Sequence, residues 1–575
     1  MTRATGRLEA TPARQPLTVR ALLPTWSEWR PAFRAPGADL LAGLIVALVA
    51  LPLALGFGIS SGLGAAAGLA TAIVAGALAA VFGGSRFQVS GPTGAMTVVL
   101  VPIVHQHGAS GVLTVGLMAG FVLVVLAVAG VGRAVRYMPA PVLEGFTAGI
   151  AVVIALQQFP AALGIAHVEG DKVWQSAVQA VRRFIEEPSV VTPVTALVVA
   201  VVVLAGGRYL PKLPFALVAV AAATVAAELF DLDLARIGTI PSGLPAPSVG
   251  FVHFDQLGSL LAPALAVAAL AALESLLSAT AADSMCVGTR HNPDRELFGQ
   301  GLANIAAPLF GGVPATGAIA RTAVNVRSGG RTRLAALTHA ALLAAIIYLA
   351  APLVADIPLA ALAGVLLATT VRMVETASLL AIARASRGDA IIMALTFGVT
   401  VALDLVTAVA VGVAFAIVLA LRSVAREARL EQVPLDENDH FAEEHELLRE
   451  HIVAYRIDGP LFFAAAHRFL LELAEVADVK VVILRMSKVT ALDTTGALVL
   501  KDAIAKLEHR HIKVLLSGLR SDHRRRLTAI GALLADSENS LFDNTRDAID
   551  HARRYVPVAK GFGAGQSWAN TLTHR

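Results

Sequence analysis

Two short segments of similar sequence decide the fold: VSGPTGAMTV at residues 89–98 and GGVPATGAIARTAVNVRSGGRT at residues 311–332. Each contains the tripeptide Thr-Gly-Ala shortly after a proline, beginning at Thr93 in the first segment and at Thr316 in the second. The two threonines are 223 residues apart (316 minus 93). A match at a fixed offset of this length predicts an internal repeat.

The composition divides the chain into two parts. Of its 575 residues, 56% are hydrophobic and 15% are charged, whereas about 25% of the residues of a soluble domain are charged. The mean hydropathy is +0.70. Residues 40–421 form an almost continuous series of apolar stretches, and residues 422–575 have the composition of a soluble domain. We therefore expect a polytopic membrane domain followed by a soluble domain.

The membrane-spanning segments are expected to be helices, because a backbone polar group in lipid needs a partner within its own segment. The apolar stretch at 40–58, moved by the 223-residue offset, falls on the stretch at 261–282, so seven spans are predicted to be repeated. Because seven is odd, the two halves have opposite orientations, as in many secondary transporters. The fourteen predicted spans are 40–58, 64–82, 92–104, 111–131, 140–158, 190–206, 213–229, 261–282, 297–310, 316–326, 334–351, 357–372, 388–403 and 405–421.

The distribution of basic residues predicts that both termini are cytoplasmic. The even-numbered connections between spans carry the excess of Lys and Arg, whereas the opposite loop at 229–260 has three aspartates and one arginine. The N-terminal segment lacks the apolar core of a signal peptide and is interpreted as a retained tail. The sequence thus indicates a multi-pass protein of the cell (inner) membrane, in contact with membrane lipid.

The third and tenth predicted spans are short. Their apolar runs of 11 to 13 residues would cover only about 16–20 Å as helices, so each could begin near the middle of the bilayer. The proline and glycine residues break the helix there, and Thr93 or Thr316 could cap the new N-terminus. Two such N-termini facing each other would present free N–H groups and partial positive charge to an anion. The alternative is that both segments are loops before surface helices.

Two ionisable residues lie inside apolar spans, where charge is costly and usually functional. Arg321 follows Thr316 by five residues, or about 7.5 Å along a helix, and could complete the anion site. It could instead pair with a carboxylate or extend to the cytoplasmic surface. Glu274, with Ser278 one turn later, could bind a cation or carry a proton; alternatively it is a structural partner of Arg321. Glutamate alone does not decide between a proton and sodium.

The soluble part shows alternating strand and helix patterns, which predict an α/β domain. Strands are expected at HIVAYRI, VKVVILRM and IKVLLSG, and helices at 464–477, 495–509 and 521–534. Asp493 or Thr494 could cap the second of these helices. The sequence contains neither a phosphate-binding glycine loop nor a nucleophile elbow, so an enzyme is not expected. A single cysteine and scattered histidines indicate no metal site, and no basic run interleaved with aromatics suggests a nucleic-acid partner.

Five segments occur in a characteristic order along the chain: LPLALGFGISSGLGAAAGL at 51–69, VSGPTGAMTV at 89–98, APVLEGFTAGIAVVIALQQ at 140–158, ALESLLSA at 272–279 and the 311–332 segment. Their order resembles the SulP sulfate-permease family of anion transporters, whose members include prestin. The Asp493-Thr494-Thr495-Gly496 loop is similar to the turn of a STAS domain, which ends most family members.

The resemblance implies a fold of fourteen spans arranged as a seven-plus-seven inverted repeat, divided into core and gate subdomains. The substrate would bind between half-helices 3 and 10, and transport would proceed by elevator-like alternating access in a homodimer. Ala320 stands where prestin-like members have a serine that helps to hold the anion, and Leu53 replaces a glutamine of many sulfate permeases. Carried over to this chain, the anion-facing residues are Thr93, Gly94, Ala95, Gly317, Ala318, Ala320 and Arg321.

Other positions match sites of ion coupling and regulation. Glu274 and Ser278 correspond to the residues that bind the cation in sodium-coupled bicarbonate members of the family. Asp493, Thr494 and Thr495 form a candidate regulatory loop, in which Thr495 matches the phosphorylated serine of soluble STAS proteins. A cytoplasmic protein partner of the STAS domain is a further expectation.

These observations predict a secondary active transporter of a small anion (dicarboxylate, sulfate or bicarbonate) coupled to protons, with no other cofactor. One alternative is a sodium-coupled bicarbonate symporter, and another, of a different class, is a STAS-linked membrane anion sensor. The expected organisation is an N-terminal cytoplasmic segment at 1–38, a transmembrane anion transport domain at 39–424, a linker at 425–447, a STAS domain at 448–556 and a flexible tail at 557–575.

Overall fold

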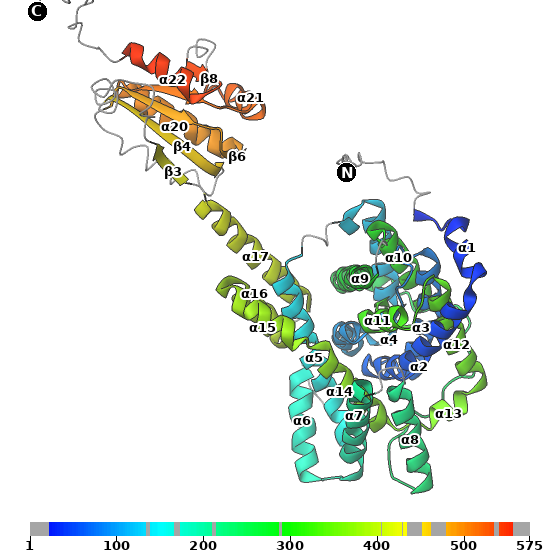
Figure 1. Ribbon diagram of the computed structural model, residues 1–575. Helices are drawn as coiled ribbons and strands as arrows, with labels where there is room; N and C mark the ends of the chain where they lie inside the picture. The colour runs from blue at the N-terminus through cyan, green and yellow to red at the C-terminus, as the bar shows by residue number, and fades with distance from the viewer. Residues whose placement is uncertain are drawn as a thin grey trace, which may run out of the picture. The chain divides into compact units, whose positions relative to one another are not determined.

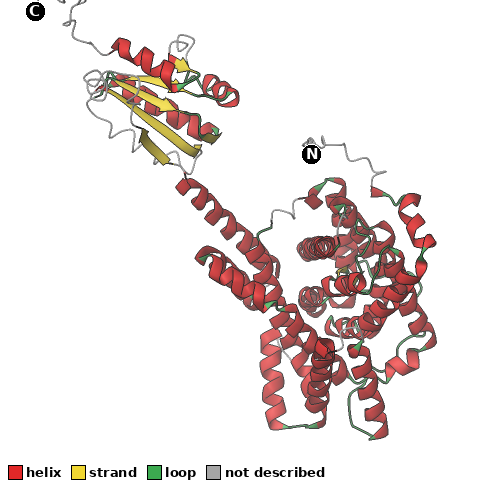
Figure 2. Ribbon diagram, viewed as in Figure 1, coloured by secondary structure: helices red, strands yellow, loops and turns green. Residues whose placement is uncertain are grey.

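The computed structural model contains two compact units, Met1–Ala414 and Phe415–Arg575, which are described separately (Figure 1). The first unit is helical, and the second contains the larger β-sheet (Figure 2). The residues that the structure describes are 22–133, 138–165, 173–209, 214–286, 290–403, 405–427, 429–433, 451–461, 479–533 and 540–555.

The first unit consists mainly of apolar helices. Seven stretches of the described residues are long and apolar enough to cross a membrane, in agreement with the predicted helical membrane protein; the count of fourteen spans stays a prediction. The long helices are α2 (Pro36–Ser60), α3 (Ala65–Phe82), α4 (Gly94–Val128), α5 (Ala140–Leu163), α7 (Val191–Tyr209), α8 (Phe215–Leu229), α9 (Leu257–Met285), α10 (Pro293–Leu309), α12 (Leu334–Leu349), α14 (Leu359–Met373) and α16 (Arg387–Ala402). Helix α17 (Leu405–Glu427) begins in the first unit and ends in the second.

Shorter helices complete the first unit. Of these, only α11 had been predicted, as the span at 316–326. The amphipathic helix α6 lies between two predicted spans and carries arginine and glutamate residues, which is why a search for apolar runs omits it. These helices are α1 (Trp26–Arg34), α6 (Val173–Glu186), α11 (Ile319–Arg327), α13 (Ala351–Ala355) and α15 (Thr376–Ala385).

Helix α4 combines the predicted spans 92–104 and 111–131. Its backbone leaves the helical conformation at Gly108, where φ is +67°. Glycine tolerates this left-handed conformation because it has no Cβ atom. The first helical stretch, from Gly94 to this break, is therefore short, as the sequence predicted.

Two very short strands, one just before α4 and one just before α11, pair with each other; this pair is called the crossing below. Strand β1 (Ser90–Gly91) pairs antiparallel with β2 (Thr316–Gly317), and the partners are Ser90 with Gly317 and Gly91 with Thr316. The sequence did not predict this pairing. Thr93 caps α4 by accepting a hydrogen bond from the Met96 N–H at 3.4 Å. The predicted cap at Thr316 is wrong, because α11 begins after Ala318 and the Thr316 hydroxyl is used elsewhere.

The helices of the first unit pack in two groups. In one, α10 lies against α3 and α4, α4 against α9, and α12 against α2 and α3. In the other, α5 lies against α14 and α16, and α14 against α7. Strands β1 and β2 and helix α11 contact members of the first group. The grouping agrees with the predicted division into core and gate subdomains.

The second unit contains a mixed β-sheet with helices on both faces. The strand order is β3-β4-β5-β7-β8, with β6 also paired to β4, and only β3 is antiparallel to its neighbour. Val482 and Leu484 of β5 contribute to the hydrophobic cluster shared with α20 and α21, whereas Val481 and Ile483 face the cluster of α22. The elements are β3 (Arg429–Val433), β4 (Ile452–Leu461), β5 (Val481–Arg485), β6 (Val489–Leu492), α20 (Thr494–His509), β7 (Lys513–Ser517), α21 (Ser521–Ala529), β8 (Leu541–Phe542) and α22 (Thr545–Ala552).

This arrangement confirms the predicted α/β domain and corrects some details. Strand β3 lies in the predicted linker at 425–447, and β6 lies between the predicted strand VKVVILRM and the Asp493 loop, where no strand was predicted. Helix α21 ends at Ala529, five residues before the predicted end. The predicted helix at 464–477 and the tail at 557–575 lie outside the described residues.

Candidate functional site

Glu274 connects the two crossing segments at the centre of the candidate site. Its Oε2 atom accepts a hydrogen bond from the Thr93 hydroxyl at 2.8 Å and another from the Thr316 hydroxyl at 2.7 Å. The neighbouring Ser275 hydroxyl accepts a hydrogen bond from the Gly317 N–H at 2.9 Å. One turn of α9 therefore fixes both Thr-Gly-Ala segments, although they are far apart in sequence.

The first turns of α4 and α11 differ in their exposure. Gly94 and Ala95 at the start of α4 are buried, and the Thr93 hydroxyl already caps that helix. Gly317 and Ala318 before α11 are also buried, but Ile319 and Ala320 in its first turn are exposed. The N–H groups of a first helical turn have no partner within the helix and carry partial positive charge. The open first turn of α11 can therefore receive an anion.

Arg321 lies behind this open turn. Its side chain is 1% exposed, and its Nη2 atom donates a hydrogen bond to the Pro92 carbonyl oxygen of the opposite segment. Within the described part of the chain, its Nη1 atom is buried without a hydrogen-bond partner, and Arg321 forms no ion pair with Glu274. The alternative in which Glu274 is a structural partner of Arg321 therefore does not take the form of a direct ion pair; the two side chains still interact through their charges. The guanidinium places its positive charge next to the crossing.

The guanidinium of Arg321 packs closely against Gly91 of β1. A Cβ atom added at Gly91 would lie 2.6 Å from the Arg321 Nη1 atom and 3.4 Å from the Cα atom of Ala72. The first distance is shorter than any normal contact of a Cβ atom. The glycine of the Gly-Pro pair thus makes room for the guanidinium that reaches Pro92.

Ser278 lies one turn after Glu274 but contacts α11 instead of the carboxylate. Its hydroxyl donates a hydrogen bond to the Thr322 Oγ1 atom at 3.0 Å, and the Val89 N–H donates to the same oxygen at 3.1 Å. The oxygen atoms gathered at Glu274 are those of Thr93 and Thr316. A carboxylate with two hydroxyl groups can hold a proton or contribute ligands to a hard cation such as sodium. The described residues contain no cluster of three His, Cys, Asp or Glu that could hold a metal ion.

Glu296 of α10, which was not predicted from the sequence, holds the segment that precedes β1. The Glu296 Oε2 atom accepts hydrogen bonds from the N–H groups of Gly84 at 2.8 Å and Ser85 at 2.9 Å. Its Oε1 atom accepts from Gln88 Nε2 at 2.7 Å and from Gln300 Nε2 at 3.0 Å. The carboxylate is 1% exposed. Four donors thus converge on one buried negative charge.

The same face of α10 holds both crossing strands. Gln300 Nε2 donates a hydrogen bond to the Ser90 hydroxyl at 2.6 Å. Asn304 accepts from the Ala315 N–H at 2.8 Å and donates to the Ala315 carbonyl at 2.9 Å. Glu296, Gln300 and Asn304 recur every four residues, so they share one helix face. This polar stripe in an otherwise apolar run was a sequence signal for the network.

The two helix groups also meet close to the site. The Thr97 hydroxyl, one turn into α4, donates a hydrogen bond to the Gln157 Oε1 atom of α5 at 3.3 Å. The Nε2 atom of Gln157 is buried and has no hydrogen-bond partner among the described residues. This amide group is an unpaired hydrogen-bond donor near the N-terminus of α4.

The predicted regulatory loop lies in the second unit. Asp493 caps α20, because its Oδ1 atom accepts a hydrogen bond from the Gly496 N–H at 2.7 Å. Thr494 and Thr495 are exposed in the first turn of that helix. Of the two predicted caps, Asp493 and Thr494, it is Asp493 that caps the helix. The side chain of Thr495 is accessible to solvent.

Comparisons with known proteins agree on the family. Residues 37–396 match the Sulfate permease family, and residues 447–548 match the STAS domain. YvdB of Bacillus subtilis (strain 168) is 35% identical over 517 residues, which are 88% of this chain and 96% of that protein.

Two solved structures resemble the chain. The transmembrane domain of a cyanobacterium bicarbonate transporter, BicA, is 36% identical, with a TM-score of 0.61 over 66% of this chain and 98% of that one. The murine anion transporter Slc26a9 in its inward-facing state has a TM-score of 0.80 over 96% of this chain and 97% of that one; at 17% identity it shows the fold alone. The chain is a multi-pass membrane protein of the sulfate permease family with a C-terminal STAS domain.

Proposed function

We propose that this protein is a secondary active transporter of small anions such as a dicarboxylate, sulfate or bicarbonate. The observation that carries the proposal is the crossing of β1 and β2, with Glu274 joined to both Thr93 and Thr316. Family membership supports anion transport, and the similarity to BicA supports bicarbonate as a candidate.

The substrate is an anion because positive charge and free donors surround the crossing. The open first turn of α11, with Ala320 exposed, offers backbone N–H groups, and Arg321 adds a positive charge behind it. The unpaired amide of Gln157 supplies another donor. Several donors at separate positions suit an oxyanion, which accepts hydrogen bonds on more than one oxygen. A small substrate fits a site built from glycine, alanine and threonine.

Glu274 is the proposed coupling residue, and a proton is the proposed coupling ion. In the ionised state its Oε2 atom accepts both threonine hydroxyls, which ties α9 to the two crossing segments. Protonation removes negative charge beside the anion site and weakens these charge-assisted hydrogen bonds. Binding of a proton and of an anion would therefore favour each other. The two helix groups suggest elevator-like movement of the core against the gate.

The proposal extends to the assembly and its location. We place a homodimer in the cell (inner) membrane with both termini in the cytoplasm, as the basic connections between spans indicate. The exposed Thr494 and Thr495 would be available to a cytoplasmic protein partner of the STAS domain. The transporter uses a coupling proton and no other cofactor.

Uptake of labelled anions into proteoliposomes tests the proposed function. A pH gradient, acidic outside, should accelerate uptake, and Glu274→Gln should abolish this acceleration while retaining anion exchange at constant pH. Glu144→Gln is the matched control, since Glu144 is a carboxylate of α5 whose partner is the Ser378 hydroxyl. Unchanged gradient-driven uptake by Glu274→Gln would rule out the coupling role. A panel of competing anions identifies the substrate.

Sodium-coupled bicarbonate symport is the second candidate function, favoured by the three oxygen atoms of Glu274, Thr93 and Thr316 and by the similarity to BicA. Replacing sodium with a bulky organic cation at fixed pH separates the two: uptake stops only if sodium is the coupling ion. The candidate from another class, a STAS-linked membrane anion sensor, predicts binding without flux. Substrate flux in liposomes that contain only the purified protein would exclude it.

A further inference from the structure

Helix α1 has one face bound to the protein and another that is exposed and aromatic. Trp26 and Phe33 are 65% and 64% exposed, and their rings stack with centroids 5.7 Å apart. Arg30 projects on the same side of the helix, because positions 26, 30 and 33 share one helix face. Ala32, on the opposite face, is completely buried. Large exposed aromatics of this kind mark contact surfaces.

The buried face is held by ion pairs. Glu28 accepts a hydrogen bond from Arg295 Nη1 at 2.5 Å, and its other oxygen lies 3.2 Å from Arg333 Nε. These arginines also donate to backbone carbonyls at the end of α3, Arg295 to Phe82 and Arg333 to Ala80. The orientation of α1 is therefore fixed by α3, α10 and the residue preceding α12.

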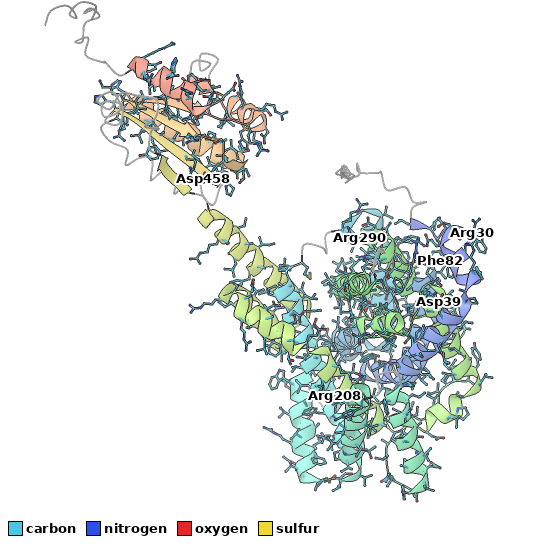
Figure 3. All side chains as sticks on the ribbon, in the orientation of Figure 1. Arg30, Asp39, Phe82, Arg208, Arg290 and Asp458 are labelled. Atoms are coloured by element: carbon cyan, nitrogen blue, oxygen red, sulfur yellow. The ribbon has the colours of Figure 1, made fainter. Side chains whose placement is uncertain are left out.

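Exposed leucines follow α1 in the first turns of the next helix, α2. Only Ala35 separates α1 from α2, and α2 is long and apolar enough to cross a membrane. Leu40, Leu41 and Leu44 in its first turns are 47%, 56% and 41% exposed. Asp39, which is labelled in Figure 3, precedes these leucines in α2 and is buried. It accepts hydrogen bonds from the N–H groups of residues 331 and 332, so this junction is also fixed.

We propose that α1 lies in the membrane interface, with Trp26 and Phe33 in contact with lipid and with Arg30 and Arg34 bound to anionic headgroups. Tryptophan is enriched at the boundary between the acyl chains and the headgroups, because its ring is apolar and its N–H is polar. Two arginines beside the aromatic pair supply the charge that attracts an anionic surface. Because α2 is long and apolar enough to cross a membrane, we expect lipid to cover its exposed leucines and to extend over the aromatic pair. The ion pairs of Glu28 then connect this lipid contact to the helices that frame the crossing.

Quenching of Trp26 fluorescence tests the location. Trp29→Phe, Trp174→Phe and Trp568→Phe leave Trp26 as the only tryptophan of the full-length chain. The protein is reconstituted in vesicles of phosphatidylcholine and phosphatidylglycerol in which the phosphatidylcholine carries bromine at a shallow or a deep position of its acyl chains. Shallow bromines should quench Trp26 more strongly than deep ones, and aqueous iodide should quench it weakly. The water-exposed reference has Lys506→Trp, at an exposed position of α20, and phenylalanine at the four natural tryptophan positions.

Two results would overturn the proposed location. Iodide quenching of Trp26 as strong as that of the reference, with no bromolipid effect, would place the face in water. Protection from both quenchers would mean that the aromatic face of α1 is covered by protein, either a second copy of the chain or residues 1–21. The location is tested independently of transport, so its failure would leave the proposed function unaffected.

Moving the bromine to phosphatidylglycerol tests the headgroup preference. At equal mole fractions, brominated phosphatidylglycerol should quench Trp26 more than brominated phosphatidylcholine. Each arginine near an anionic surface contributes about 1 kcal/mol of attraction, the equivalent of about a fivefold preference for that surface. Arg30→Gln with Arg34→Gln should bring the quenching ratio of the two lipids to one. A ratio of one before the arginines are replaced would overturn the preference for anionic headgroups.

Discussion

Glu28 is the residue whose ionisation is tied most clearly to stability outside the membrane-spanning segments. Burial alone would raise the pKa of its carboxyl, but the hydrogen bond and charge of Arg295 and the charge of Arg333 together hold the pKa below its usual value. Because the folded-state pKa is depressed, the stabilisation is present above the pKa of the unfolded state. It is lost as the pH falls through the lower, folded-state value.

We predict that Glu28→Gln lowers the free energy of unfolding by about 1 kcal/mol at neutral pH, since the pair is only partly buried and solvent screens it. The loss should shrink as the pH falls below the range in which Glu28 ionises, because the parent protein then loses the same interaction. Thermal unfolding of both proteins in detergent across this pH range measures the difference. A constant difference at every pH would show that the ionised form of Glu28 is not the source of the stabilisation.

Gly91 supports a second prediction at the residue scale. Gly91→Ala should displace the Arg321 guanidinium from Pro92, because the added Cβ atom would lie 2.6 Å from Nη1. Moving a group by about 1 Å within a binding site can reduce activity about 100-fold, so a large loss of anion uptake is expected. Gly398→Ala is the matched control, since a Cβ atom there meets nothing within 4 Å. Normal uptake by Gly91→Ala would show that the position of Arg321 does not matter for transport.

At the scale of elements, apolar runs located the long helices of the first unit within a few residues, because burial in lipid imposes length and composition on them. The pairing of β1 with β2 could not be predicted in this way. Its strands have two residues each and lie more than 220 residues apart, so tertiary packing alone decides the contact. The partner of Ser278 is likewise decided by side-chain geometry: periodicity placed it on the face of Glu274, but its hydroxyl reaches Thr322. The stripe of Glu296, Gln300 and Asn304, in contrast, was visible in the sequence.

That stripe gives a prediction for α10. Glu296→Gln exchanges one acceptor oxygen for an NH2 group that must face buried donors. Each donor left unpaired costs about 1–3 kcal/mol, so we expect a much lower melting temperature and a distorted β1, with loss of anion binding. Glu144→Gln on α5 again serves as the control and should have little effect on melting. Substrate-induced thermal stabilisation of the folded fraction separates the loss of stability from the loss of anion binding. Normal anion binding by Glu296→Gln would show that the network contributes to stability and not to binding.

For the whole molecule, the division into two units predicts which segments a bound anion protects from hydrogen exchange. Every residue of the candidate site belongs to the first unit, whereas the Asp493 loop and its sheet belong to the second. A ligand at 100 times its Kd stabilises the state that binds it by about 2.7 kcal/mol, which slows hydrogen exchange through opening of that state by about 100-fold. Exchange measured by mass spectrometry with and without substrate should therefore slow in segments 90–97, 272–278 and 316–322. The sheet strands at 481–485 and 513–517 should be unaffected, and equal protection there would mean that the STAS domain takes part in binding the anion.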